Sequence, residues 1–66
     1  MRGTVEWFNN EMGYGFIIAE EKSYFAHYSK VRAKGYKALK EGQVVEFKPV
    51  EVEGKLQAHE IFVVKQ

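Results

Sequence analysis

Aromatic side chains are the groups in this sequence whose spacing points to a chemical role. They fall in two short stretches, residues 7–17 (WFNNEMGYGFI) and 24–28 (YFAHY). Successive side chains of a strand point to opposite faces, so Tyr14 and Phe16 would share one face. An exposed ring can stack on an unpaired base, which contributes roughly 1–3 kcal/mol, and exposed rings also anchor protein partners. The spacing predicts a binding surface, for unpaired nucleic acid or for a protein, unless these rings form the core.

Catalysis and metal binding find little support among the other side chains. The sequence has no cysteine, and His27 and His59 have no acidic residue at a spacing typical of metal ligands. No nucleophile, base and orienting group occur together in a recognisable set. We therefore expect a protein that is not an enzyme and that uses no metal and no cofactor.

Length and composition indicate one small domain, residues 1–66. A chain of this size buries only about 60% of the surface of its unfolded form, so a patch of exposed rings would need a functional reason. No apolar run reaches the length of a membrane span, and the first residues do not resemble a signal peptide. We expect a cytoplasmic protein with no membrane partner.

The charges are nearly balanced but unevenly placed. The net charge of +1 is too small for binding nucleic acid by charge alone. One basic run is uninterrupted by acids, and it contains Lys30, Arg32, Lys34, Lys37 and Lys40. This run is either a solvated loop that keeps the protein soluble or a source of phosphate contacts.

Five β-rich segments are predicted, over residues 3–8, 14–20, 24–28, 44–52 and 55–64. Turns are predicted at 9–13, 20–23 and 53–54, and a long loop before residue 42. Ser29 is expected to cap a short helical turn. Five strands without a long helix favour a closed barrel, because closure removes free sheet edges. Pro49 has no N–H and therefore predicts an edge, a bulge or a splay in the fourth strand.

Aliphatic residues supply the predicted barrel interior and leave the rings outside. Barrel interiors favour compact branched side chains. His27 prefers water, which places Phe25 on the same outer face, beside the rings of the neighbouring strand. The predicted interior consists of Val5, Ile17, Ala26, Val45, Phe47, Ile61 and Val63.

Three segments in this order resemble the bacterial cold-shock proteins: VEWFNNEMGYGFI (5–17), YFAHYS (24–29) and KGYKALKEGQVVEF (34–47). The resemblance implies an all-β, five-stranded antiparallel barrel of the oligonucleotide-binding (OB) fold. It also implies that the chain binds single-stranded RNA and DNA with a pyrimidine bias, as an RNA chaperone or a regulator of transcription or translation. The contact residues that it implies are Trp7, Phe8, Tyr14, Phe16, Phe25, His27, Tyr28 and Tyr36, and we add Lys37 as a phosphate contact.

Several positions depart from the family pattern near these rings. Glu6 and Met12 stand where the family usually carries lysines that would meet phosphates, and Ser23 replaces a usual acidic residue. The loss of two phosphate contacts would flatten the salt dependence by roughly 1.4 units of slope for a single strand. Tyr24 takes a valine's place and would point inward beside the smaller Ala26, so that the two side chains exchange volume.

The fourth and fifth strands depart further from the pattern. Pro49 stands where a core isoleucine is usual, and residues 55–58 (KLQA) replace a Gly-Pro-Gln-Ala run. With the low net charge, these departures leave a second interpretation open, a protein- or self-interaction barrel whose nucleic-acid binding is weak or lost. We expect a monomer or a weak homodimer.

Overall fold

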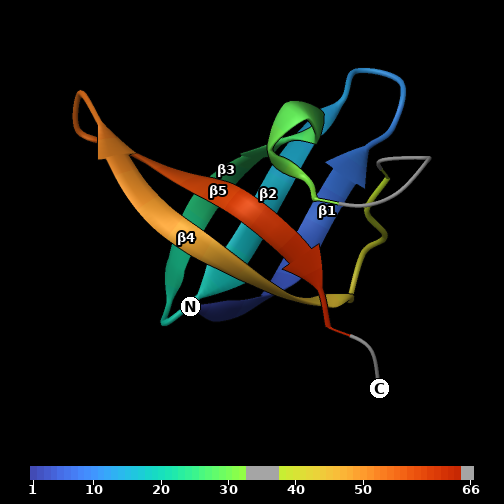
Figure 1. Ribbon diagram of the computed structural model, residues 1–66, viewed down its shortest axis with the longest axis horizontal. Helices are drawn as coiled ribbons and strands as arrows, with labels where there is room; N and C mark the ends of the chain where they lie inside the picture. Colours follow the sequence, from blue (N-terminus) through green and yellow to red (C-terminus); the bar gives the residue numbers. More distant parts are fainter. Residues whose placement is uncertain (33–37, 65–66) are drawn as a thin grey trace.

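Five strands and one short 3₁₀ helix make up the described part of the computed structural model, residues 1–32 and 38–64 (Figure 1). The elements are β1 (Arg2–Asn9), β2 (Tyr14–Ala19), β3 (Lys22–His27), η1 (Tyr28–Lys30), β4 (Val44–Val52) and β5 (Lys55–Val63). The five predicted strands are confirmed, with some ends shifted by one or two residues. The predicted Ser29 cap is wrong: η1 begins at Tyr28, and the His27 side chain caps it by accepting a hydrogen bond from the Ser29 N–H.

The strands close into a barrel in the order β1-β2-β3-β5-β4, which confirms the predicted architecture. Neighbouring strands run antiparallel except β3 and β5, which are parallel, so the expectation of a wholly antiparallel barrel is wrong at this one seam. The parallel seam pairs Phe25 with Gln57 and Ala26 with Ala58. In Figure 1, β4 and β5 lie in front of the other strands, and their hairpin projects beyond the barrel.

Two tight turns close the β2–β3 and β4–β5 hairpins. Their φ values are positive, 49° and 64° at Glu20 and Glu21, and 51° and 77° at Glu53 and Gly54. Two successive positive values characterise the type I′ turn, whose twist matches that of the flanking strands. Glycine adopts this conformation freely, whereas another residue costs roughly 1–2 kcal/mol. The predicted β4–β5 turn is confirmed. The turn predicted over residues 20–23 is shorter than expected: it consists of Glu20 and Glu21, because β3 already begins at Lys22.

The barrel interior is aliphatic apart from two rings. Of the seven residues predicted for it, six are at most 4% exposed. Val63 was assigned there wrongly: it is 38% exposed, because it lies where β5 ends. Tyr24 points inward as expected, and its ring centroid lies 5.0 Å from that of Phe47. The sequence prediction did not include four further buried residues, which are Ala19, Val31, Leu39 and Ala58.

A bulge in β1 decides which side chains of this strand face outward. The β1–β2 register shifts between Val5 and Trp7, so that Glu6 is an extra residue. Val5 therefore lies opposite Ile17 in the interior, while Trp7 lies opposite Phe16 on the outer face. Without the bulge, strict alternation would send Val5 and Trp7 to the same face.

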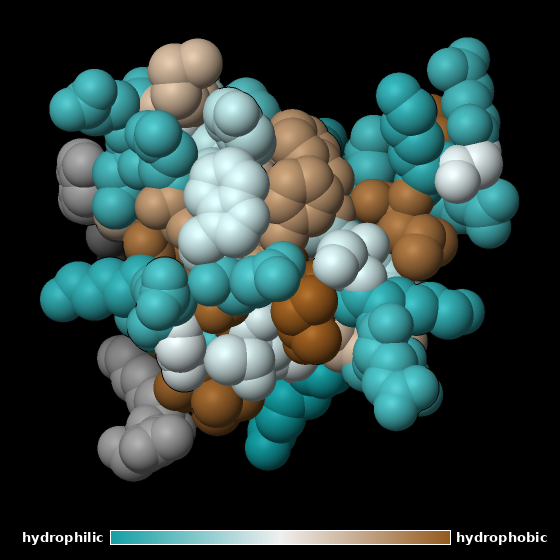
Figure 2. Space-filling model, turned by 180° about the vertical axis from the view of Figure 1, so that it is seen from behind, coloured by the Kyte–Doolittle hydropathy of each residue, from teal (hydrophilic) through white to brown (hydrophobic). Residues whose placement is uncertain are grey.

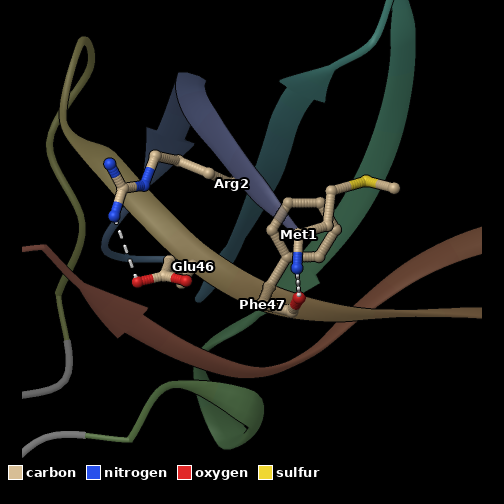
Figure 3. Close-up of polar contacts among 4 residues, drawn as sticks. All are labelled: Met1, Arg2, Glu46 and Phe47. Carbon is tan, nitrogen blue, oxygen red and sulfur yellow. Dashed lines mark hydrogen bonds and ion pairs between the residues drawn. The ribbon is translucent and has the colours of Figure 1, made fainter.

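The β1–β4 seam joins the start of the chain to the first residues of β4 (Figure 3). The Met1 amine donates to the Phe47 carbonyl at 2.9 Å, and the Phe47 N–H donates to the Met1 carbonyl at 2.8 Å. Arg2 and Glu46 form an exposed ion pair of 3.3 Å beside these bonds, which contributes little to stability. Within the described residues, β4 beyond this point pairs with β5 alone. Pro49 thus occupies an edge, which is one of the three alternatives predicted for it.

Candidate nucleic-acid interface

Rings from three neighbouring strands form two joined rows on the outer side of β1, β2 and β3. In the first row, Trp7 lies opposite Phe16 and Phe16 opposite Phe25, with centroid distances of 5.6 and 5.8 Å. In the second row, Tyr14 lies opposite His27. The Tyr14 ring joins the rows, because it lies 5.6 Å from Trp7 and 5.8 Å from Phe25. We call these five side chains the ring face.

The ring face is partly open to solvent. Trp7 is 37% exposed, and the other four rings are half-buried. Figure 2 views this side of the molecule: pale and brown side chains gather near the centre, with hydrophilic groups around them. The interplanar angles between these rings run from 30° to 73°, so neighbours pack edge or tilted against each other and leave ring surface uncovered. The prediction that these rings lie outside the barrel is confirmed.

Two glycines allow the backbone to approach the rings closely. A Cβ atom on Gly15 would lie 2.2 Å from the Trp7 carbonyl oxygen and 2.7 Å from the Phe8 Cα. No side chain fits in this space between β1 and β2. Gly13 has a φ of +79°, and a Cβ atom there would lie 2.6 Å from the Tyr28 ring. Gly15 thereby lets the β1 and β2 backbones come close together, and Gly13 makes room for the Tyr28 ring beside the β1–β2 turn.

The turn between β1 and β2 is held by Asn9. Its side-chain oxygen accepts hydrogen bonds from the N–H groups of Glu11 and Met12, at 3.0 and 2.9 Å. Its carbonyl also accepts the Gly13 N–H at 2.8 Å. An asparagine side chain that bonds the backbone two residues on is a common way to stabilise a turn. This turn presents Met12, which is 65% exposed.

Tyr28 extends the ring face beyond His27, at the end of β3. Their ring centroids lie 4.6 Å apart, and Tyr28 is 48% exposed. The His27 Nδ1 accepts the Ser29 N–H at 3.2 Å and lies 2.9 Å from the Ser29 hydroxyl. In the neutral ring, the proton therefore sits on Nε2. Among residues 1–32 and 38–64 no hydrogen bond engages Nε2, so its N–H can donate to a ligand.

Of the three remaining predicted contact residues, the structure describes only Phe8. Phe8 lies opposite Gly15, is half-buried and packs against the barrel interior, so it is shared between core and surface. Tyr36 and Lys37 lie outside the described residues. For these two, the assignment stays a sequence prediction.

The charges around the ring face are mixed. Glu6 is exposed in the β1 bulge, and among residues 1–32 and 38–64 it forms no ion pair. Of the basic run, Arg32 and Lys40 are exposed and Lys30 is half-buried. A strand crossing the ring face would therefore meet an acid on β1 and the cations Lys30 and Arg32 beyond the end of β3. Lys40 belongs to a turn that is hydrogen-bonded to Val5 in β1.

A hollow next to the ring face contains residues that the sequence prediction did not include. Its volume is about 530 Å³, and it is lined by Phe16, Ser23, Phe25, Lys55, Leu56 and Gln57. The parallel β3–β5 seam brings the last three beside the rings, and this adjacency cannot be read from sequence order. The one available signal was the departure of residues 55–58 from the family pattern.

The described part of the chain holds no helix long and apolar enough to cross a membrane. In that same part, no group of three or more His, Cys, Asp or Glu side chains is placed to hold a metal ion. The chemistry that the described surface offers is stacking on rings and hydrogen bonding by a few polar groups at their border.

Comparisons with known proteins agree with this geometry. A family model described as 'Cold-shock' DNA-binding domain matches residues 1–64, which include all three segments that carry the resemblance. The cold shock proteins CspA of Staphylococcus aureus (strain USA300) and Staphylococcus epidermidis are each 55% identical to this chain over 51 residues, covering 76% of it and 77% of the relative. A solved structure, drosophila Unr CSD456, matches with a TM-score of 0.80 and 24% identity over 97% of this chain. The match covers 26% of the fly chain, and at this identity it shows the fold alone.

Proposed function

The chain belongs to the 'cold-shock' DNA-binding domain family and is a nucleic-acid-binding protein, and on this premise we propose that its ring face holds unpaired RNA and DNA. The observation that carries the proposal is the open row of Trp7, Phe16 and Phe25 across three strands. Each base has two flat faces, and a double helix already uses them for its own stacking. Only unpaired bases can lie on these rings.

Stacking of bases on the ring face supplies most of the free energy that micromolar binding requires. Each stacked base contributes roughly 1–3 kcal/mol, and micromolar binding corresponds to about 8 kcal/mol. Three or four stacks therefore approach this range with few phosphate contacts. Glu6 and Met12 lower the number of such contacts, and the basic run that begins at Lys30 supplies the phosphate attraction that remains.

Titration of the intrinsic fluorescence tests the proposal directly. Trp7 is the chain's single tryptophan, so quenching by oligo-U or oligo-dT reports contact at the ring face. We expect saturable quenching by both oligonucleotides and little change with a duplex of the same length. Saturable quenching by the duplex, or none by either single strand, would overturn the proposal.

The cellular role that we propose is that of an RNA chaperone or regulator that keeps transcripts unpaired, with a pyrimidine bias, in the cytoplasm. The names of the curated relatives support a link to cold shock. A surface that stacks bases without reading most of their edges suits such a role, because it binds many sequences. We further propose that residues 1–66 act as one domain.

Weak self-association is the second candidate activity. Phe62 and Met1 are 53% and 42% exposed and line a hollow of about 250 Å³ together with Phe47, and Glu46, Lys48 and Glu60 complete its lining. Exposed apolar side chains that share a hollow favour contact with a second copy. Sedimentation at rising concentration should then show dimers that Phe62→Ser removes without reducing oligo-U binding. A monomer at all concentrations would refute this candidate.

A further inference from the structure

We propose that Met12 is a site of reversible oxidation, where a peroxide converts the thioether to a sulfoxide and thereby lowers the affinity of the ring face for a single strand. The substrate of the site is hydrogen peroxide or an organic hydroperoxide. The effect on affinity rests on the proposed function of the ring face. The oxidation itself does not depend on that function.

Met12 is the more accessible of the two methionines in the chain. It is 65% exposed, whereas Met1 is 42% exposed and lines a hollow beside Phe47 and Phe62. Two backbone hydrogen bonds to Phe47 also hold Met1 in the β1–β4 seam. A peroxide must reach the sulfur in order to react with it, so the more exposed methionine is oxidised first.

The β1–β2 turn keeps Met12 at the border of the ring face. On one side, the Met12 N–H donates to the Asn9 side-chain oxygen at 2.9 Å. On the other side, the Gly13 carbonyl accepts the Tyr28 N–H at 2.9 Å, and Gly13 lies directly against the Tyr28 ring. Tyr14, the ring that joins the two rows, follows Gly13 in the chain. The backbone of Met12 is thus fixed between Asn9 and two rings of the proposed binding surface.

The oxidation is a single two-electron step. A lone pair on the Met12 sulfur attacks one oxygen of the peroxide, so a sulfur–oxygen bond forms while the oxygen–oxygen bond breaks. The other oxygen takes the proton of the first and leaves as water, or as an alcohol when the oxidant is an organic hydroperoxide. The sulfur is oxidised and the peroxide is reduced. A methionine sulfoxide reductase reverses the change with a dithiol, which becomes a disulfide while the oxygen leaves as water.

The sulfoxide suits the border of a base-stacking surface less well than the thioether. The thioether is apolar, polarizable and flexible, so it packs readily against an aromatic base. The sulfoxide oxygen is a polar acceptor, and a base that covers it must displace its water. The phosphate oxygens of the strand are acceptors too, so they offer it no hydrogen bond. The loss of one sulfur–aromatic contact should weaken binding about twofold to tenfold.

The order of oxidation is measured without nucleic acid. Brief treatment of the chain with hydrogen peroxide, followed by mass spectrometry of its peptides, gives a rate of sulfoxide formation for Met12 and for Met1. We expect Met12 to react faster. A rate at Met12 no higher than that at Met1 would overturn the assignment of the site.

A bound strand should protect Met12 if it passes over the β1–β2 turn. Saturating oligo-U should slow the oxidation of Met12 and leave the rate at Met1 unchanged. An unchanged rate at Met12 in the bound chain would overturn the claim that the strand covers this side chain.

Titration of the Trp7 fluorescence gives the effect on affinity. The dissociation constant for oligo-U should rise about twofold to tenfold after oxidation of Met12, and it should return to its first value after treatment with the reductase. An unchanged constant in the oxidised chain would overturn the inference and leave the proposed function standing. Failure of the untreated chain to bind would overturn the proposed function and with it the effect on affinity, while the order of oxidation is still decided by mass.

Two variants separate oxidation at Met12 from damage elsewhere. Met12→Leu keeps an apolar side chain without sulfur, so peroxide should leave its dissociation constant unchanged. The double variant Met12→Leu, Val63→Met places the sulfur away from the ring face, since Val63 is 38% exposed where β5 ends and lies opposite Val45 in β4. The methionine introduced at position 63 should be oxidised without loss of affinity. A loss of affinity on treatment of either variant would refute the role of Met12, and if a thermal melt shows that the double variant does not fold, Met12→Leu decides alone.

Discussion

Glu6 and Met12 offer a quantitative test of the path that a bound strand takes over the ring face. Both side chains are exposed, one in the β1 bulge and the other at the β1–β2 turn, so lysines fit at these positions without disturbing the fold. The double variant Glu6→Lys, Met12→Lys gains two charges at the first position and one at the second, which raises the net charge from +1 to about +4. If each lysine meets one phosphate, the slope of log K against log salt steepens by about 1.4 units.

This change in slope is large enough to measure. A fourfold rise in salt, from about 50 to about 200 mM, should weaken oligo-U binding by the double variant about sevenfold more than it weakens binding by the parent. The double variant should also bind more tightly than the parent at the lower salt concentration. Quenching of Trp7 by oligo-U at both salt concentrations gives the four constants needed.

A control variant separates local phosphate contacts from the effect of total charge. Glu20→Lys changes the charge as much as Glu6→Lys does, but it lies in the turn between β2 and β3, where the backbone conformation suits lysine no worse than glutamate. We expect the parent's slope from Glu20→Lys. An unchanged slope in the double variant, or an equal steepening in Glu20→Lys, would refute the view that a strand passes beside Glu6 and Met12.

Three further substitutions test the core, the ring row and the turns. Gly15→Ala forces a Cβ atom against β1 backbone and should lower the free energy of unfolding in urea by about 2–4 kcal/mol; a loss below about 1 kcal/mol would contradict the close approach. Phe16→Ala should weaken oligo-U binding by roughly 1–3 kcal/mol in the fluorescence titration, while Phe62→Ala, an exposed ring elsewhere, should not; equal effects would speak against the row. Glu21→Gly removes a side chain from a residue whose φ is 64°, so it should raise the free energy of unfolding by about 1 kcal/mol and raise the melting temperature with it. A lower melting temperature would count against the type I′ turn.

Much of the fold could be predicted because the strand segments alternate clearly. Once His27 was placed in water, the alternation put Phe25 outside and Ala26 inside, and the structure agrees. The aliphatic residues at Val45 and Ile61 were assigned to the interior on the same reasoning, and both are fully buried. The alternation of apolar and polar residues was sufficient to assign side chains to the interior or the outer face wherever a strand contained no bulge.

The sequence was less informative where tertiary pairing decides. Glu6 and Glu60 sit at register shifts, with a φ of 49° at Glu60, and nothing in their types marks a bulge. The parallel β3–β5 seam places Gln57 beside Phe25, a contact between strands that are not consecutive. The Ser29 cap was wrong because the helix begins one residue earlier, at Tyr28, and the N–H groups of Val31 and Arg32 that Ser29 would have capped donate to the Tyr28 and Ile61 carbonyls.

The bulge in β1 makes position 6 a spacer. If Glu6 instead paired regularly with β2, alternation would put Val5 and Trp7 on the same face, and the indole would leave the first place of the row. As an extra residue without a partner in β2, Glu6 places no demand on the type of side chain at this position. The charge at position 6 is therefore free to vary. Substitutions there can change the affinity of such a barrel for nucleic acid without disturbing the ring face.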